Sequence, residues 1–159
     1  MSGRPIALDA ARLRERLLTA RIWTFVWMLH VLVKLCGVPR LLRLCVLRAP
    51  RPPADARRVV ACVERVLERH RGLSRSPCLK RSLTLYRFLG AEATELEFCL
   101  GVRYADRPRP GPGEGPGQRQ LQGHAWLLRH GMPYLELDHQ HVRRFRVIYR
   151  YPVRQRTHA

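Results

Sequence analysis

The strongest constraint on the fold of this chain is a change in the period of its hydrophobic pattern near residue 90. Up to Leu89, apolar residues recur at helical spacing in segments bounded by Gly and Pro. From Glu95 onward, they alternate with polar residues, as in half-buried strands. Helices followed by an antiparallel sheet predict an α+β domain.

The helical half divides into four predicted segments. They cover residues 7–35 (as one or two helices), 40–47, 56–69 and 78–89. Gly37 and Pro39 end the first segment, and residues 49–53 read as a linker. Asp55 is the expected N-cap of the third segment.

The second half contains four predicted strands. They cover residues 95–104, 122–129, 133–138 and 144–151. The first should carry Leu96, Phe98, Leu100 and Val102 on one face. Residues 105–120 are rich in Pro and Gly and predict a flexible surface loop.

The net charge of +18 suggests acidic partners. Lys34 and Lys80 are the only lysines among the 30 basic residues. Abundant Arg with scarce Lys is also what a GC-rich coding sequence produces, so we attribute part of this charge to composition rather than to a binding surface. The arginines are spread evenly and no RNP, KH or helix-turn-helix pattern is present, which argues against nucleic acid as a partner. The alternative function is a non-catalytic basic module that binds acidic peptide or RNA.

The five cysteines form no CxxC pair, which argues against a zinc site and a disulfide framework. Free thiols indicate a reducing compartment, and we expect the chain to be cytoplasmic. No GxxxxGK[ST] phosphate loop is present, and we expect neither a cofactor nor a metal.

Residues 22–33 form an apolar run that Lys34 ends. This run is shorter than the ~20 residues that span a bilayer. We expect a buried or interfacial helix, so any membrane association would be peripheral and not spanning. Residues 1–21 make a poor signal peptide.

Cys78 differs from the other cysteines, which lie in apolar runs. It follows Pro77 at the start of a predicted helix, where the helix dipole and unpaired N–H groups favour a thiolate. The neighbouring Lys80 and Arg81 favour it as well. Cys78 is therefore the candidate nucleophile.

His124 is the candidate base, on the predicted strand over 122–129. A three-residue hairpin loop over 129–131 would place it opposite Glu136, our first choice for the acid that orients the imidazole. A two-residue turn would instead oppose it to Leu137. Asp138 is the second choice for the acid.

Gln122 lies two residues before His124, hence on the same face of the strand, and its amide is a candidate oxyanion donor. Together these residues predict a thiol peptidase. Cys78 would attack the scissile carbonyl, His124 would transfer the proton, and Glu136 or Asp138 would hold the imidazole. Water and an amine both remain open as the acyl acceptor.

The runs SPCLKRSLTLYRFL, ELEFCLGVRY, GHAWLLRHGMPYLE and FRVIYRYP, over about 59–152, resemble the transglutaminase-like domain of lasso peptide biosynthesis B2 proteins. The resemblance implies a papain-like core with a Cys-His-acid triad that cuts the leader from a ribosomally made precursor peptide. Cys78 and His124 match the family's nucleophile and base. The family's acid is usually Asp, whereas the closest position here is Glu136.

The resemblance also sets the expected organisation and partners. Residues 1–53 would form a helical Arg/Leu-rich N-terminal segment, and residues 54–159 the peptidase domain with the insert at 105–120. The implied partners are the precursor peptide, a separate B1-type protein that recognises the leader, and a lasso cyclase.

Overall fold

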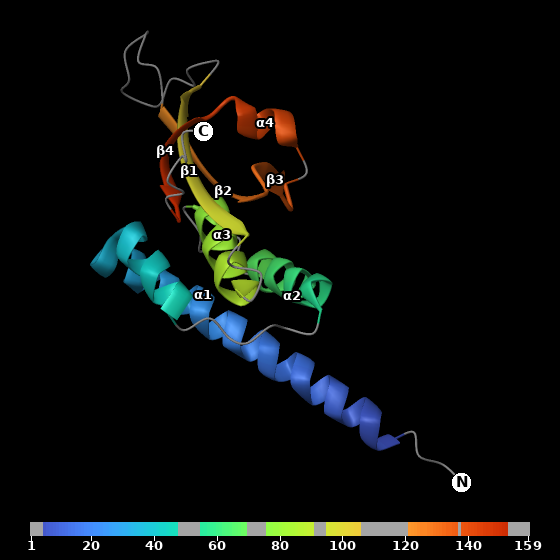
Figure 1. Ribbon diagram of the computed structural model, residues 1–159. Coiled ribbons are helices and arrows are strands. Elements are labelled where there is room, and N and C mark those ends of the chain that lie inside the picture. Colours follow the sequence, from blue (N-terminus) through green and yellow to red (C-terminus); the bar gives the residue numbers. More distant parts are fainter. Residues whose placement is uncertain are drawn as a thin grey trace. The chain divides into compact units, whose positions relative to one another are not determined.

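The computed structural model describes residues 5–47, 55–69, 76–90, 95–105, 121–136 and 138–152. It divides into two compact units, Met1–Thr94 and Glu95–Ala159 (Figure 1). The first is helical and the second is built on an antiparallel sheet, which confirms the α+β prediction. The predicted linker over 49–53 and residues 106–120 of the predicted loop lie outside the described residues.

The first helix, α1 (Pro5–Leu47), joins the first two predicted helical segments. Gly37 separates them with a non-helical backbone (φ 69°, ψ 165°), which glycine adopts without steric cost. Pro39 follows two residues later, where its ring fits the start of a new helical arm. The chain therefore bends where the sequence predicted a break.

Helix α2 (Ala56–Arg69) has the predicted bounds. Asp55 caps it as expected, because its Oδ1 accepts a 3.0 Å hydrogen bond from the Arg57 N–H. Its buried stripe consists of Val59, Cys62, Val63 and Val66. Helix α3 (Pro77–Phe88) completes the helical unit.

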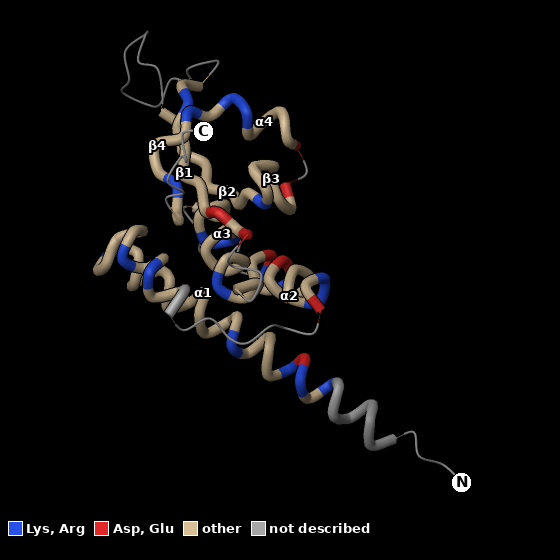
Figure 2. The backbone as a smooth tube through the Cα atoms, viewed as in Figure 1, with Lys and Arg blue, Asp and Glu red and all other residues tan. Residues whose placement is uncertain are grey.

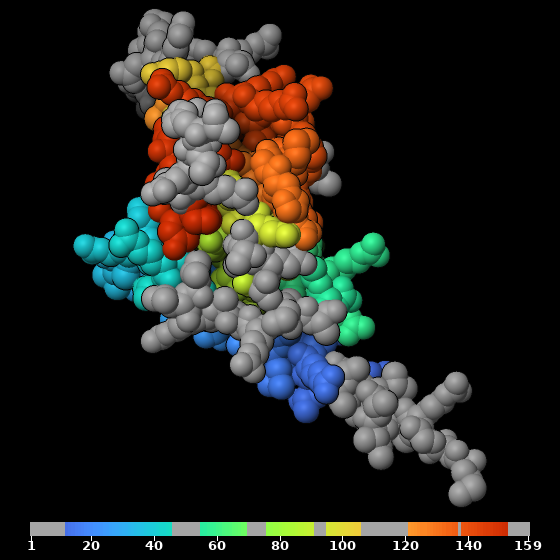
Figure 3. Space-filling view, viewed as in Figure 1, coloured from blue at the N-terminus to red at the C-terminus, as the bar shows by residue number. Residues whose placement is uncertain are grey.

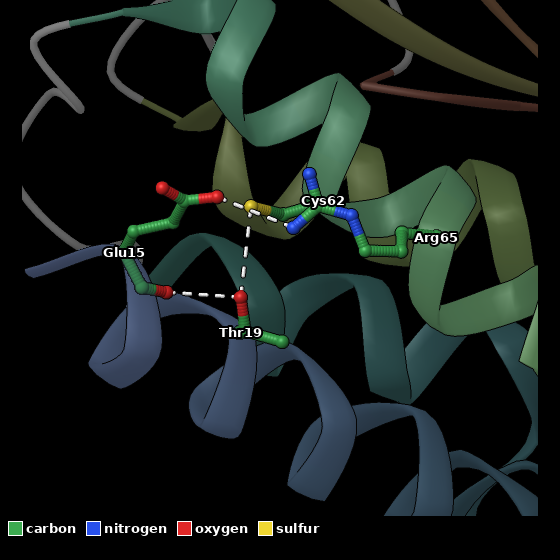
Figure 4. Close-up of polar contacts among 4 residues, drawn as sticks. All are labelled: Glu15, Thr19, Cys62 and Arg65. Atoms are coloured by element: carbon green, nitrogen blue, oxygen red, sulfur yellow. Dashed lines mark hydrogen bonds and ion pairs between the residues drawn. The ribbon is translucent and has the colours of Figure 1, made fainter. Parts of the chain in front are cut away.

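Polar and aromatic contacts join α1 to the other two helices. The Thr19 hydroxyl donates to the Cys62 sulfur at 3.7 Å, and Arg65 forms a 3.2 Å ion pair with Glu15 (Figure 4). The rings of Phe25 and Phe88 meet edge to face at 5.8 Å. One side of α1 therefore packs against the other helices of its own unit.

Within the described residues, one stretch of α1, Arg12–Cys45, is long and apolar enough to cross a membrane. The core helix of a soluble protein passes the same test of length and composition. Only 28% of the most apolar part of Arg12–Cys45 is buried, so much of the apolar surface of α1 faces outward.

The sheet has the strand order β3-β2-β1-β4, all antiparallel. The strands are β1 (Leu96–Tyr104), β2 (Leu121–Arg129), β3 (Met132–Tyr134) and β4 (Arg146–Tyr151). Gly101 pairs with His124, and Cys99 pairs with Trp126. Paired residues share a face, so one face carries His124 and Trp126 and the other carries the predicted Leu96 and Phe98 stripe.

A short helix, α4 (His139–Arg143), lies between β3 and β4 in the chain. Val142 from this helix and Phe145 just after it join Cys99, Trp126 and Leu128 in a buried cluster. The space-filling view shows the orange and red residues of this unit as closely packed side chains (Figure 3). The face of the sheet that carries His124 is therefore covered by the segment that includes α4.

The hairpin between β2 and β3 has a two-residue turn, so of the two loop lengths that the sequence left open, the three-residue loop behind our first choice of acid is wrong. Arg129 pairs with Met132, and both turn residues, His130 and Gly131, have positive φ angles of 52° and 79°. Two positive φ angles are typical of the type I′ turn, which matches the twist of the flanking strands.

The strand predicted over 133–138 is also wrong in extent, because β3 ends at Tyr134. Leu135 has a φ of 61°, in the left-handed region, which ends the ladder. Leu137 lies outside the described residues.

Candidate active site

The imidazole of His124 lies in an aromatic setting on β2, and its side chain is 17% exposed. It stacks on Trp126 with ring centroids 5.8 Å apart and an interplanar angle of 17°. Phe145 lies 5.2 Å away and His141 meets the ring edge-on at 5.6 Å. These rings hold the imidazole in one orientation and screen it from water.

Glu136 places a carboxylate close to this imidazole. Its Oε2 lies 3.6 Å from His124 Nε2, which is itself buried, and the Glu136 side chain is 15% exposed. This contact does not come from the cross-strand pairing that we predicted. At the observed register, an extended β3 would pair Glu136 with Ala125 and turn it to the opposite face. The left-handed residue Leu135 ends the strand first and redirects the carboxylate.

Asp138 has a different role in the structure. Its Oδ1 accepts a 2.9 Å hydrogen bond from the His141 N–H and so caps α4. The same hydrogen bond lowers the pKa of the Asp138 carboxyl group. Asp138 thus fixes the helix that carries His141, while Glu136 contacts His124.

Gln122 is exposed and shares the face of His124, as predicted. Its side-chain oxygen accepts a 3.0 Å hydrogen bond from Arg103 Nε. The Arg103 guanidinium also lies over the Phe145 ring, 5.0 Å from its centroid. The amide is thereby oriented with its oxygen toward Arg103 and its N–H groups available for another acceptor.

Cys78 belongs to the helical unit, where it is the second residue of α3 and half-buried. Pro77 occupies the first position, and the Ser76 side chain makes no capping hydrogen bond. The thiol is therefore carried by the N-terminal turn of the helix, where the helix dipole favours its anion.

The two cations that we expected to support Cys78 have other contacts. Lys80 is buried, its ammonium contacts the ring of His30, and burial lowers its pKa. Arg81 forms a 2.7 Å ion pair with Glu64. The helix N-terminus is thus the clearer source of electrostatic support for Cys78.

Sequence reasoning missed Phe145 and His141 as neighbours of His124. Phe145 lies in the strand predicted over 144–151, and His141 lies in the connection before it. No sequence pattern there predicted the short helix α4. Trp126 lies two residues after His124 and so on the same face of β2, a spacing that could have indicated the stacking of the two rings.

Among the described residues, no three His, Cys, Asp or Glu side chains gather as metal ligands. The titratable groups near His124 instead form a base-acid pair in an aromatic setting, an arrangement suited to proton transfer.

A family model described as the transglutaminase-like superfamily matches residues 19–150. This match spans both units and includes Cys78, His124 and Glu136. No curated protein and no solved structure matches the chain. Because the family model covers most of the sequence, the chain belongs to the transglutaminase-like superfamily, which includes cysteine peptidases.

Proposed function

We propose that this protein is a cysteine peptidase that removes the leader from a ribosomally made precursor peptide during lasso peptide maturation. Membership of the superfamily supports the thiol chemistry, and the sequence resemblance to the B2 proteins supports the substrate class. The observation that carries the proposal is the His124–Glu136 pair, a half-buried imidazole with a carboxylate 3.6 Å from its Nε2.

From this contact we infer a separate role for each ring nitrogen of His124. With Glu136 at Nε2, the proposal assigns Nδ1 to proton exchange with the thiol. A carboxylate at one nitrogen fixes the tautomer and stabilises the imidazolium that forms when the other takes a proton. Glu136 is therefore a positioning residue, and it acts through His124.

In the proposed reaction, Nδ1 takes the proton from Cys78 and the thiolate attacks the scissile carbonyl carbon. Collapse of the tetrahedral intermediate breaks the C–N bond, and His124 returns the proton to the departing amine. Water then attacks the thioester, losing its proton to His124, and the leader leaves as a carboxylic acid with the thiol restored. An amine in place of water would give acyl transfer from the same thioester.

Cys78 suits the role of nucleophile better than the other cysteines. It is half-buried at a helix start, whereas Cys45, Cys62 and Cys99 are buried. Burial raises the pKa of Cys45, and it raises that of Cys99 to about 11. A nucleophile needs both thiolate character and access.

The proposed partners are the precursor peptide, a separate B1-type protein that presents its leader, and a lasso cyclase that acts on the released core. The net charge of +18 favours acidic segments among them. We place the reaction in the cytoplasm, which suits a chain with five free thiols.

The deciding experiment incubates precursor peptide with the full-length protein and its B1-type partner and follows the products by mass spectrometry. Cys78→Ala and His124→Ala should each reduce cleavage by about 10³-fold or more. The double variant should lose little beyond either single variant, since the two residues act as one unit.

Cys36→Ala is the matched control, because Cys36 is also half-buried but lies inside α1. It should cleave normally. Full activity of Cys78→Ala with the partner present would rule out the peptidase proposal. If the two losses multiplied in the double variant, Cys78 and His124 would not act as one unit.

A further inference from the structure

Helix α1 is apolar on its outward side as well as on its packed side. The outward residues, which we call the α1 stripe, are Trp23, Trp27, Met28, Val31 and Leu35. Their exposed fractions range from 47% for Trp23 to 73% for Leu35. Spacing of four residues along a helix places most of them in one row, so the stripe is continuous. Large apolar patches of this kind mark interaction surfaces.

The packing of the other side of the same helix argues against a membrane-spanning state. Ile22, Val26 and Leu29 are almost fully buried. Thr19 contacts Cys62 of α2 (Figure 4). His30 contacts Lys80 of α3. A helix with one side held against its own unit cannot be surrounded by lipid, so the described packing does not suit a membrane-spanning state.

Positive charge brackets the stripe. On the described side chains of α1 the cations are Arg12, Arg14, Arg16 and Arg21 before it, and Lys34, Arg40 and Arg43 at its end and beyond. The one acidic side chain among them is Glu15, which is paired with Arg65. Figure 2 shows this as blue segments along α1 with a single red one. Basic residues around an apolar, Trp-bearing face are typical of helices that lie in the headgroup region of anionic membranes.

We propose that the α1 stripe binds the surface of an anionic bilayer, with α1 lying in the plane of the membrane and its packed side facing away from the lipid. From Trp23 to Leu35 the helix is about 18 Å long, enough to lay its apolar side chains among the upper acyl carbons. Trp23 and Trp27, with ring centroids 6.1 Å apart, supply side chains that favour the membrane interface. The arginines and Lys34 contact anionic headgroups. This surface acts independently of the proposed peptidase site.

The test uses the full-length protein and vesicles of mixed phosphatidylglycerol and phosphatidylcholine. The wild type should sediment with them, and acyl-chain-brominated lipids should quench its tryptophan emission. In Trp23→Ser/Trp27→Ser the remaining Trp126 is 2% exposed, so its emission should not be quenched. This variant should partition at least tenfold more weakly, since it loses the burial of two large side chains. Leu35→Ser, the most exposed position, should weaken binding with the tryptophans intact.

Met132→Ser is the matched control, because Met132 is 55% exposed but lies on β3. It should bind as the wild type does. Vesicles of phosphatidylcholine alone, or added salt, should weaken wild-type binding. The proposal is overturned if the wild type fails to sediment with anionic vesicles, as it would if a protein partner covered the stripe. Equal loss in Met132→Ser and Leu35→Ser would also overturn it.

Discussion

The indole of Trp126 occupies the space where a side chain at position 101 would begin. A Cβ on Gly101 would lie 2.7 Å from Trp126 Cη2 and 3.0 Å from the Arg146 carbonyl oxygen. Gly101 also pairs with His124 and sits where the pairing of β1 with β4 shifts register. The missing side chain therefore lets the indole lie flat across β1 and stack on the imidazole.

Gly101→Ala should displace Trp126 and with it the His124 ring. We expect a loss of about 1–3 kcal/mol in the free energy of unfolding, because the backbone carbonyl cannot move aside easily. Leader cleavage should fall as well. Urea unfolding and cleavage rates measure the two effects. Gly123→Ala is the control, since a Cβ there meets no atom within 4 Å, and equal damage from both variants would contradict the explanation.

Iodoacetamide at neutral pH should label Cys78 fastest among the five cysteines. It is half-buried at a helix start, whereas burial raises the pKa of Cys99 from 9.0 to about 11. A rise of about two units lowers the thiolate fraction near pH 7 by about a hundredfold. Cys36 is half-buried but not at a helix start, so it should react at an intermediate rate. Peptide mapping by mass spectrometry gives the rates, and uniform labelling of the folded protein would contradict an activated Cys78.

An arginine-lined cavity of about 840 Å³ in the sheet unit should contribute to binding of acidic peptide segments. Arg103, Arg144 and Arg146 line it together with apolar side chains such as Ile148. Arg146→Gln should weaken the binding of an acidic leader peptide to the Cys78→Ala protein and should make the affinity less dependent on salt. Fluorescence anisotropy at two salt concentrations measures this.

The control for that cavity is Arg57→Gln, an equal change of charge at an exposed position on α2. It should leave the affinity almost unchanged. If the affinity of the wild type for the peptide did not change with salt, the positive charge of the cavity would have no part in peptide binding.

The sequence was most informative where one local rule determines the structure. Asp55 located the start of α2, whose predicted bounds are the observed ones, and Gly37 with Pro39 located the bend in α1. Alternation gave β1 its two faces. These features depend on the spacing of apolar residues, on capping and on backbone freedom, which can be read from neighbours in the chain.

The contacts of the candidate site depended on features without such a local rule. The choice of a two-residue turn rested on His130 taking a positive φ, which His-Gly permits but does not require. Leu135 then adopts a left-handed backbone that the sequence gives no reason to expect of a leucine. Glu136 was therefore proposed as the partner of His124 through a cross-strand pairing that does not form, and it reaches the imidazole by a different path.

The two carboxylates after β3 should respond differently to loss of charge. Glu136→Gln keeps the size of the side chain but removes the negative charge 3.6 Å from His124 Nε2. The tautomer and the imidazolium then lose their support, and kcat/KM for leader cleavage should fall by about 10²-fold, less than in Cys78→Ala. Asp138→Asn should have little effect, because Asn caps a helix as well as Asp does.

Asp138→Ala separates capping from catalysis. Loss of the hydrogen bond to the His141 N–H should lower the unfolding temperature, with a smaller loss of activity than Glu136→Gln causes. Thermal unfolding and cleavage rates on the same preparations distinguish the two variants. If Asp138→Asn were inactive and Glu136→Gln active, Asp138 would be the orienting acid and α4 would have to rearrange when substrate binds. A Glu136→Gln protein that is as stable as the wild type but slow would identify the carboxylate as the group that positions His124.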